Sequence, residues 1–358
     1  MNTPTATATA PAAPAVPCPR DRAESLTATV DLVRAQRNIE RFHAAAHARG
    51  LTVRAHVKGH RTLALAVRQI EAGAVGISVT QAGQARRYLE AGITDIVIAH
   101  PWHDPWRFAL FADLARDCTL AVHVDHPGSL PALAAAARAA GSSIGVLARI
   151  GDGHHATATT PADLLALAEQ ARSTPGLRFA GLTAYQGMTA PGDAHNRFAI
   201  GARTARYAAH CAEHLRAHGL PCPTVSVGGT PTAAGIRSVP GITEIGAGAY
   251  PLLDAGLAQA GACAPEDIAI TVAPATEHHR QDAEGILAQH RYPWQPRGAV
   301  LPADGSPVPP PHICPLLTEI RELRVRGAGG RVQHWPVLNT PDTAPTAPGT
   351  APTPGPAR

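Results

Sequence analysis

The chain has 358 residues and a formal net charge of +4, and 45% of its residues are hydrophobic. This length can bury one large and one smaller domain. Its basic residues form no stripe, which argues against a nucleic-acid-binding protein. No apolar run approaches the roughly 20 residues that span a bilayer, so no membrane-spanning segment is expected.

Both ends of the chain are low in sequence complexity. Residues 1–19 and 340–358 are mostly Pro, Thr and Ala, and we expect both to be disordered tails. The first tail lacks the basic start and apolar stretch of a signal peptide. The six cysteines form no Cys-x-x-Cys pair, as is typical of reduced thiols. A cytoplasmic protein is therefore expected.

Between the tails, short β-rich apolar segments alternate with longer segments of helical period. A strand near 26–30 comes first and is a candidate to join a later β-domain. The eight strands expected after it are Thr52–Val57, Val75–Val79, Asp95–Ala99, Thr119–Val124, Ser143–Ile150, Arg178–Tyr185, Thr224–Val227 and Ile242–Gly246. The helices expected between them include Leu63–Ala72, Gln81–Ala91, Ala162–Arg172 and Phe198–His218.

This alternation predicts a (β/α)8 TIM-type barrel over residues 20–254. No Gly-x-Gly-x-x-Gly follows the first strand, which disfavours an open doubly wound sheet. After Tyr250 the pattern changes to short strands at Ile268–Val272, Ile320–Val325 and Arg331–Val337, with no helices expected between them. We therefore expect a small C-terminal β-domain over 255–339, in which the Pro-rich stretch 293–311 is a linker or extended loop.

Lys58 is the only lysine of the chain, and it directly follows the first barrel strand. The working groups of such barrels lie at the C-terminal ends of the strands. Lysine can form a Schiff base, whereas a guanidinium cannot. Lys58 is therefore a candidate catalytic residue, unless codon bias removed the other lysines and this one survived by chance.

Two histidines accompany this lysine. His56 would share the inward face of the strand with Lys58, and His60 lies just beyond it. A histidine beside an imine can hold charge or move protons. Both are catalytic candidates, and buried structural histidines are the alternative.

Two glycine-rich segments follow the seventh and eighth barrel strands. They are Ser226–Thr232, which reads SVGGTPT, and Gly246–Tyr250, which reads GAGAY. Glycines let the backbone approach an anion, and hydroxyls with free N–H groups complete a phosphate site. The loops after strands 7 and 8 are where barrels often bind phosphate.

A third pattern is His312-Ile313-Cys314. On a strand, the side chains of residues i and i+2 point the same way, and imidazole with thiolate suits Zn²⁺. Two ligands are too few for a structural zinc site. An open site completed by water, substrate or a third residue is therefore implied.

Together these residues resemble the D-threonine aldolase and D-serine dehydratase family of alanine-racemase-like (fold type III) enzymes, which use pyridoxal 5'-phosphate (PLP) and a divalent metal. The resemblance covers most of the expected folded chain. It rests on segments 29–42, RAHVKGH at 54–60, 71–100, 181–187, Ser226–Thr230, Gly248–Asp254, PHICP at 311–315 and Trp335–Val337.

The resemblance implies a role for each candidate. Lys58 would carry PLP as a Schiff base, Tyr185 would lie near the pyridine ring, and His312 and Cys314 would bind Zn, Mn or Mg. The phosphate would be held by Ser226, Gly228, Gly229, Thr230, Gly248 and Tyr250. The family also implies a homodimer with a small-molecule amino-acid substrate.

The sequence departs from the family in three places. Gly59 stands where Thr usually follows the lysine. The loop after the fifth strand, where an Arg is common, reads Gly151–His155, with His154 and His155 at its end. The family's Glu-His-Gly segment has no secure match, and Glu277-His278 and His290 are its candidates. In the family this region contributes substrate contacts.

We expect cleavage of D-β-hydroxy-α-amino acids to glycine and an aldehyde, with His56, His60 or a metal-bound hydroxide as the base. The close alternative is a dehydratase in which Lys58 removes the α-proton and a keto acid and ammonia form. A specialised biosynthetic PLP enzyme is a further alternative. From another class, a non-enzymatic PLP-binding homeostasis protein would need the barrel alone.

Overall fold

The computed structural model describes residues 24–151, 160–188 and 190–344. Residues 1–19, most of 340–358, and His154 and His155 therefore lie outside the described residues. Within the described part, no helix is long and apolar enough to cross a membrane.

Eight parallel strands close into a barrel, which confirms the predicted fold class. In barrel order they are β2 (Thr52–Ala55), β3 (Ala74–Val79), β4 (Asp95–Ile98), β5 (Thr119–Val124), β6 (Ile144–Arg149), β7 (Leu177–Tyr185), β8 (Thr224–Gly228) and β9 (Glu244–Ala247). The barrel closes because β2 pairs with both β3 and β9.

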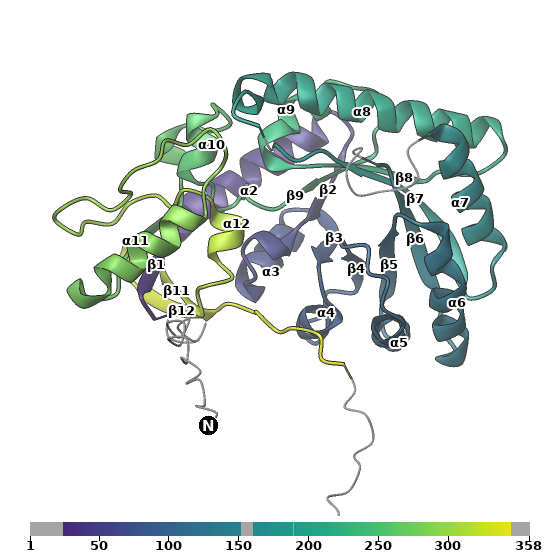
Figure 1. Ribbon diagram of the computed structural model, residues 1–358, viewed down its shortest axis with the longest axis horizontal. Coiled ribbons are helices and arrows are strands. Elements are labelled where there is room, and N and C mark those ends of the chain that lie inside the picture. Colours follow the sequence, from purple (N-terminus) through teal and green to yellow (C-terminus); the bar gives the residue numbers. More distant parts are fainter. Residues whose placement is uncertain (1–23, 152–159, 189, 345–358) are drawn as a thin grey trace, which may run out of the picture.

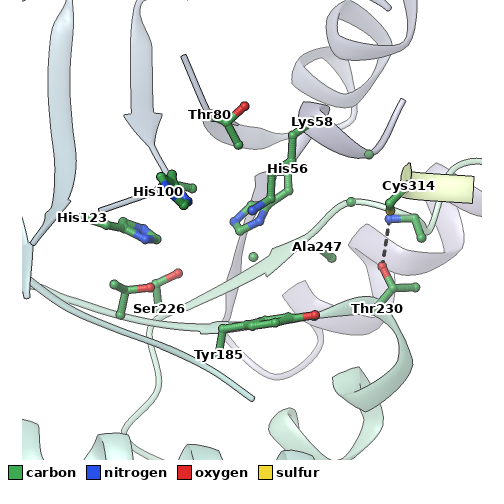
Figure 2. A pocket seen from close by; sticks show the side chains of 18 of the residues that line it. His56, Lys58, Thr80, His100, His123, Tyr185, Ser226, Thr230, Ala247 and Cys314 are labelled. Atoms are coloured by element: carbon green, nitrogen blue, oxygen red, sulfur yellow. Dashed lines mark hydrogen bonds between the residues drawn. The ribbon is translucent and has the colours of Figure 1, made fainter. Parts of the chain in front are cut away.

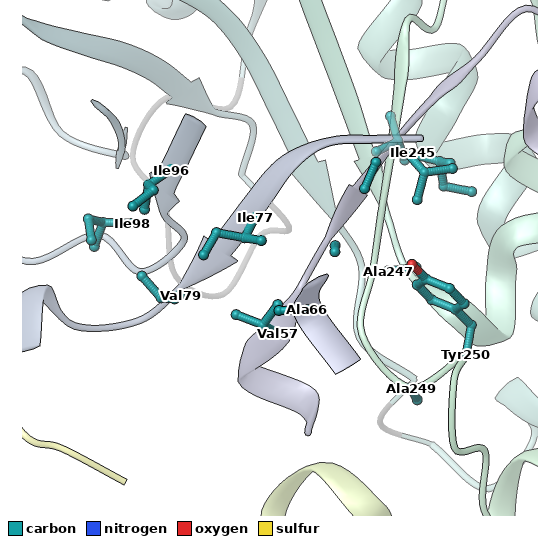
Figure 3. Packing of buried hydrophobic residues seen from close by; sticks show 14 of the residues in the cluster. Val57, Ala66, Ile77, Val79, Ile96, Ile98, Ile245, Ala247, Ala249 and Tyr250 are labelled. Carbon is teal, nitrogen blue, oxygen red and sulfur yellow. The ribbon is translucent and has the colours of Figure 1, made fainter. Parts of the chain in front are cut away.

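Helix α2, which precedes β2, and the helices between the barrel strands cover the outside of the barrel (Figure 1). They are α2 (Leu32–His47), α3 (Leu63–Glu71), α4 (Ala82–Leu89), α5 (Pro105–Leu114), α6 (Leu130–Ala139), α7 (Pro161–Ser173), α8 (Asp193–Ala217) and α9 (Ala233–Ile236). The strands are almost continuously apolar because both of their faces are buried. Figure 3 shows part of this packing, where Ile77, Ile96 and Ile245 belong to one core cluster.

A second sheet has the strand order β10-β1-β11-β12. Its strands are β1 (Leu26–Asp31), β10 (Ile270–Pro274), β11 (Glu322–Arg326) and β12 (Val332–Pro336). Strand β1 runs antiparallel to β10 and parallel to β11, so the start of the described chain lies within the sheet formed by its C-terminal part. Helix α2 then leads directly from this sheet to the barrel.

The expectation that no helices separate the C-terminal strands is wrong. Helix α10 (Ala255–Gln259) precedes β10, and α11 (Arg280–Gln289) and α12 (Ile313–Leu316) lie between β10 and β11. The spacing of Ala283, Ile286 and Leu287 gives α11 one apolar face, and all three are buried. The period of 3.6 over these ten residues is the signal that sequence reasoning missed.

The segment after β12 ties the second sheet to the barrel. The Leu338 N–H donates to the carbonyl oxygen of Arg61 (2.7 Å), and the Gly83 N–H at the start of α4 donates to the Asp342 carboxylate (2.9 Å). Figure 1 shows this segment running from the second sheet toward α4. It therefore links Arg61, in the connection between β2 and α3, with β12 and α4.

Candidate active site

A cavity of about 540 Å³ lies at the C-terminal ends of the barrel strands. This is where barrels of this class place their functional groups. Its polar lining includes three cationic side chains, four histidines and both glycine-rich loops. The residues are His56, Lys58, Arg61, His100, His123, Arg149, Tyr185, Ser226, Gly228, Gly229, Thr230, Gly248, Tyr292, His312 and Cys314.

Lys58 lies in a short turn, Val57–Gly59, that follows β2. The observed strand β2 ends at Ala55, two residues before the predicted end at Val57, so a turn and not strand alternation directs His56 and Lys58 into the cavity (Figure 2). Burial lowers the pKa of Lys58, the nearby Cys314 side chain opposes this effect, and the Arg149 and Arg61 charges lower it further. The neutral amine, which is the nucleophilic form, is therefore reached at a lower pH than in a free lysine.

Gly59 has a packing role that explains its departure from the family pattern. A Cβ atom at Gly59 would lie 2.9 Å from the carbonyl carbon and oxygen of Gly248. A Cβ atom at Gly248 would in turn lie 2.8 Å from the carbonyl oxygen of His56. The lysine turn and the loop after β9 therefore touch through their backbones, and a Thr at position 59 would separate them.

We expect Gly59→Ala to weaken PLP binding, because the added methyl group pushes the lysine turn away from Gly248. Overpacking costs about 1–3 kcal/mol, and where the PLP-binding geometry carries this cost the PLP dissociation constant should rise by about 5- to 150-fold. Gly285→Ala is the matched control, since a Cβ atom at Gly285 meets nothing within 4 Å. PLP titration of both variants is the measurement, and equal affinities would contradict the packing argument.

The loop after β8 leaves space beside the ring of Tyr185. A Cβ atom at Gly228 would lie 3.3 Å from Tyr185 Cδ2, and one at Gly229 would lie 3.3 Å from Tyr185 Cε2. The Ala249 N–H donates to Thr230 Oγ1 (3.1 Å) and so joins the two glycine-rich loops (Figure 2). Side chains at Gly228 and Gly229 would fill this space. The two glycine-rich loops therefore leave room for a phosphate-bearing cofactor.

Tyr185 presents an aromatic face to the cavity. Tyr185 is the last residue of β7, at the open end of the barrel, and 51% of its surface is exposed. Figure 2 shows its ring across the cavity from His56 and Lys58. A flat pyridine ring could lie against this face, which agrees with the place predicted for Tyr185.

Ser226 lines the cavity, but its hydroxyl group donates its hydrogen bond to a residue of the barrel interior. It donates to Glu244 Oε1 at 2.6 Å. Glu244 also accepts from Arg54 Nε (2.9 Å), and Arg54 Nη1 donates to Asp95 Oδ1 (2.6 Å). The hydroxyl proton of Ser226 therefore does not serve a phosphate, contrary to the predicted role of this side chain.

Two predicted site residues lie outside the cavity. His60 is 1% exposed, and its ring nitrogens bond Thr62 Oγ1 (3.1 Å) and Gln69 Oε1 (2.8 Å). Tyr250 is 2% exposed, and its hydroxyl bonds His43 Nε2 (2.9 Å). The structure therefore places the side chains of His60 and Tyr250 outside the cavity, where other residues occupy their polar atoms.

Sequence reasoning missed several cavity residues. Arg149 ends β6 just before the loop where an Arg was thought to be lost, so the cavity keeps a guanidinium there. His100 and His123 come from the ends of β4 and β5 (Figure 2). Their place at the ends of expected strands was the available signal.

The histidines of the cavity are held in their neutral form. Burial, followed by the charge of Lys58, lowers the pKa of His56 well below its usual range and that of His123 to about 3. The same two causes lower the pKa of His100. Near neutral pH these imidazoles can therefore accept protons but carry no charge.

His312 and Cys314 both line the cavity, although not as neighbours on a strand. His312 precedes α12, and Cys314 lies inside this short helix. The His312 ring stacks on Tyr292, with ring centroids 3.8 Å apart and planes at 21°. The strand assumption behind the prediction is wrong, yet the structure brings both side chains to the same cavity.

The electrostatics of this pair suit a metal only in part. Burial lowers the pKa of His312 to about 4, which leaves a neutral imidazole ready as a ligand. Burial and Asp254 raise the pKa of Cys314 to about 11, so metal binding would have to remove its proton. Among the described residues, no group of three His, Cys, Asp or Glu could hold a metal. The pair therefore fits an open site completed by water or substrate.

Neither candidate for the Glu-His-Gly segment lines the cavity. Glu277 and His278 lie in the turn Glu277–His279 between β10 and α11. His290 directly follows α11, and its Nε2 lies 3.6 Å from Glu319 Oε1. The segment that reaches the cavity from this part of the chain is instead the one containing Tyr292.

Comparison with known proteins adds to this geometry. The sequence profile described as alanine racemase, N-terminal domain, matches residues 30–250. D-threo-3-hydroxyaspartate dehydratase from Delftia sp. (strain HT23) is 36% identical over 261 residues, covering 71% of this chain and 68% of the relative. D-threonine aldolase from Arthrobacter sp. is 35% identical over 246 residues, covering 68% of this chain and 64% of the relative.

The structure of the Delftia dehydratase is similar over almost its whole length. It has a TM-score of 0.74 and 29% sequence identity, and the match covers 88% of this chain and 97% of that one. The same dehydratase has been solved as a cysteine variant in a metal-free form.

Proposed function

The chain belongs to the family of the alanine racemase N-terminal domain, and from this premise we propose that it is a PLP-dependent lyase that cleaves D-β-hydroxy-α-amino acids to glycine and an aldehyde. The observation that carries the proposal is the position of the only lysine. Lys58 lies in the cavity beside the glycine-rich loops, and the His312 and Cys314 side chains line the same cavity. The similarity to a D-threonine aldolase supports this reaction.

The described residues divide into a cofactor side and a metal side. Lys58 would hold PLP, the loops at Gly228–Thr230 and Gly248 would hold its phosphate, and Tyr185 would flank its ring. His312 and Cys314 would hold a divalent metal. When bound, PLP supplies a sink for the electron pair released at Cα, and the metal supplies a Lewis acid at the β-hydroxyl.

In the reaction the Cα–Cβ bond breaks, the β-hydroxyl loses its proton and Cα gains one. A neutral imidazole beside the cavity has a free ring nitrogen for this proton, although the lowered pKa makes it a weak base. His60 cannot serve because Thr62 and Gln69 occupy its ring nitrogens. We therefore assign the acceptance of the β-hydroxyl proton to one of three histidines that line the cavity near Lys58, namely His56, His100 and His123 (Figure 2).

The second candidate is dehydration, because a D-threo-3-hydroxyaspartate dehydratase is 36% identical to this chain. Lys58 would take the α-proton, the β-hydroxyl would leave as water, and hydrolysis would give a keto acid and ammonia. A non-enzymatic PLP carrier is disfavoured because a second part of the chain, with His312 and Cys314, completes the cavity. The homodimer also stays a proposal, and light scattering of the purified protein would measure it.

We expect the purified protein with PLP to convert D-threonine to glycine and acetaldehyde. EDTA should abolish the activity and Zn²⁺, Mn²⁺ or Mg²⁺ should restore it, since the His312–Cys314 pair alone leaves coordination positions open. D-serine and D-threo-3-hydroxyaspartate are assayed in parallel, with product analysis. A keto acid and ammonia instead of glycine would move the assignment to the dehydratase, and activity insensitive to EDTA would refute the metal.

A further inference from the structure

The turn that leaves the barrel after β9 contacts two distant segments of the chain. Asp254, the last residue of this segment and the N-cap of α10, is fully buried. Asp254 Oδ1 accepts from the Leu257 N–H (2.8 Å) at the start of α10. Oδ2 accepts from the Ile313 N–H (3.0 Å) and from the Tyr292 hydroxyl (3.4 Å). One carboxylate thus joins the barrel to both segments.

The residues after Asp254 strengthen the same junction. The Ala255 and Gly256 N–H groups donate to the carbonyl oxygens of Pro310 (2.9 Å) and Pro311 (3.0 Å). Trp294 Nε1 donates to the Gly256 carbonyl oxygen (3.0 Å). A Cβ atom at Gly256 would overlap Tyr292 Cδ2, so the Tyr292 ring packs directly on this backbone.

These contacts surround His312 and Cys314. Ile313, whose N–H bonds Asp254, stands between them in the chain. The Tyr292 ring, whose hydroxyl bonds Asp254, stacks on His312 on one side and on Trp294 on the other, at 3.8 and 4.5 Å. From the barrel, Arg61 Nη1 donates to the Cys314 carbonyl oxygen (3.3 Å).

We propose that Asp254 is a positioning residue that holds the His312–Cys314 pair at the cavity and thereby sets the affinity of this pair for a divalent metal. The inference rests on the proposed function for the metal's presence. Asp254 does not line the cavity, so it acts through Ile313 and Tyr292 and not on PLP or substrate.

Asp254→Asn separates this role from simple helix capping. Asn also caps helices well, and its oxygen can still accept from the Leu257 N–H. Its NH₂ group then replaces Oδ2 and cannot accept from the Ile313 N–H, which is left buried without a partner. Asp31→Asn is the matched control, because Asp31 caps α2 by accepting from the Arg34 N–H (2.9 Å), far from the cavity.

The measurement is a titration of the PLP-loaded proteins with Co²⁺, whose thiolate charge-transfer band reports on Cys314 as a ligand. Loss of a partner that orients metal ligands typically weakens metal binding by about 10–100-fold. We expect this loss for Asp254→Asn, with an unchanged PLP spectrum, and wild-type affinity for Asp31→Asn. Should Asp254→Asn not fold, Tyr292→Phe decides the question, with an expected loss of several-fold.

Wild-type Co²⁺ affinity in Asp254→Asn, or in Tyr292→Phe where that variant decides, overturns the proposal. So does a loss of PLP and metal together, which would mark Asp254 as merely structural. A wild-type protein that binds no Co²⁺ overturns it as well. Failure of the proposed function is a separate result: a protein that binds Co²⁺ but cleaves no amino acid refutes the lyase, while the affinities of the variants still decide the role of Asp254.

Discussion

Lys58→Ala is expected to lose the lyase activity by about 10³-fold or more, together with its covalent hold on PLP. No other side chain of the chain can replace it, because Lys58 is the only lysine. The other cations of the cavity, Arg61 and Arg149, cannot form a Schiff base. The measurement pairs steady-state kinetics with the absorption band at about 410–430 nm that PLP gives when bound to a lysine.

Lys58→Arg is the matched control, because it keeps the charge and the length of the side chain but not the amine. It should lose the band as completely as Lys58→Ala. Borohydride reduction of the wild-type protein should then place PLP on the one peptide that contains Lys58. A band that persists in Lys58→Ala would mean that PLP is held elsewhere.

The pH dependence of PLP uptake follows from the same side chain. Burial lowers the pKa of Lys58 below its usual 10.5. The neutral amine therefore becomes available at a lower pH than in a free lysine, and uptake should rise with pH through this lowered pKa. Rapid mixing of the protein with PLP over a pH series measures the midpoint.

Arg54→Ala is expected to give the largest loss of stability. Arg54 is 8% exposed inside the barrel and bonds Glu244, which is 4% exposed, as well as Asp95. Removing one partner of a buried ion pair costs about 3–5 kcal/mol, because the other charge stays buried without compensation. Equilibrium unfolding in urea measures the change in the free energy of unfolding.

Arg86→Ala is the control for the loss of a guanidinium as such. Arg86 also pairs with two carboxylates, those of Asp113 and Asp117, but on the surface. Such pairs contribute about 0–1 kcal/mol. Equal losses for the two variants would show that burial of Arg54 does not matter. Arg54→Met combined with Glu244→Leu should recover much of the stability, since no charge is then left alone in the barrel.

Much of the barrel could be predicted from the sequence because its signals are local. All eight predicted barrel strands overlap observed ones, since apolar β-branched runs and helical periods depend on neighbouring residues. The lysine at the end of the first strand, and the glycine-rich segments after the seventh and eighth, follow from the same order. A closed parallel barrel brings the C-terminal ends of its strands together.

The sequence could not tell which polar residues face the cavity. His60 and Tyr250 stand close to Lys58 and Gly248 in the chain, yet Gln69 and His43 bind them outside the cavity. The hydroxyl group of Ser226 is taken by Glu244 in the barrel interior. Each of these partners comes from another element, and motif spacing carries no information about it.

The sequence by itself therefore determined the fold class, the place of Lys58 and the loops around it. Only the tertiary structure decided that His312 and Cys314 reach this lysine across more than 250 residues, through Asp254, Tyr292 and the segment that follows β12. The physical reason is the range of the interactions. Periodicity and turn chemistry act between neighbours in the chain, whereas buried hydrogen bonds between distant segments form only once the barrel and the second sheet have packed.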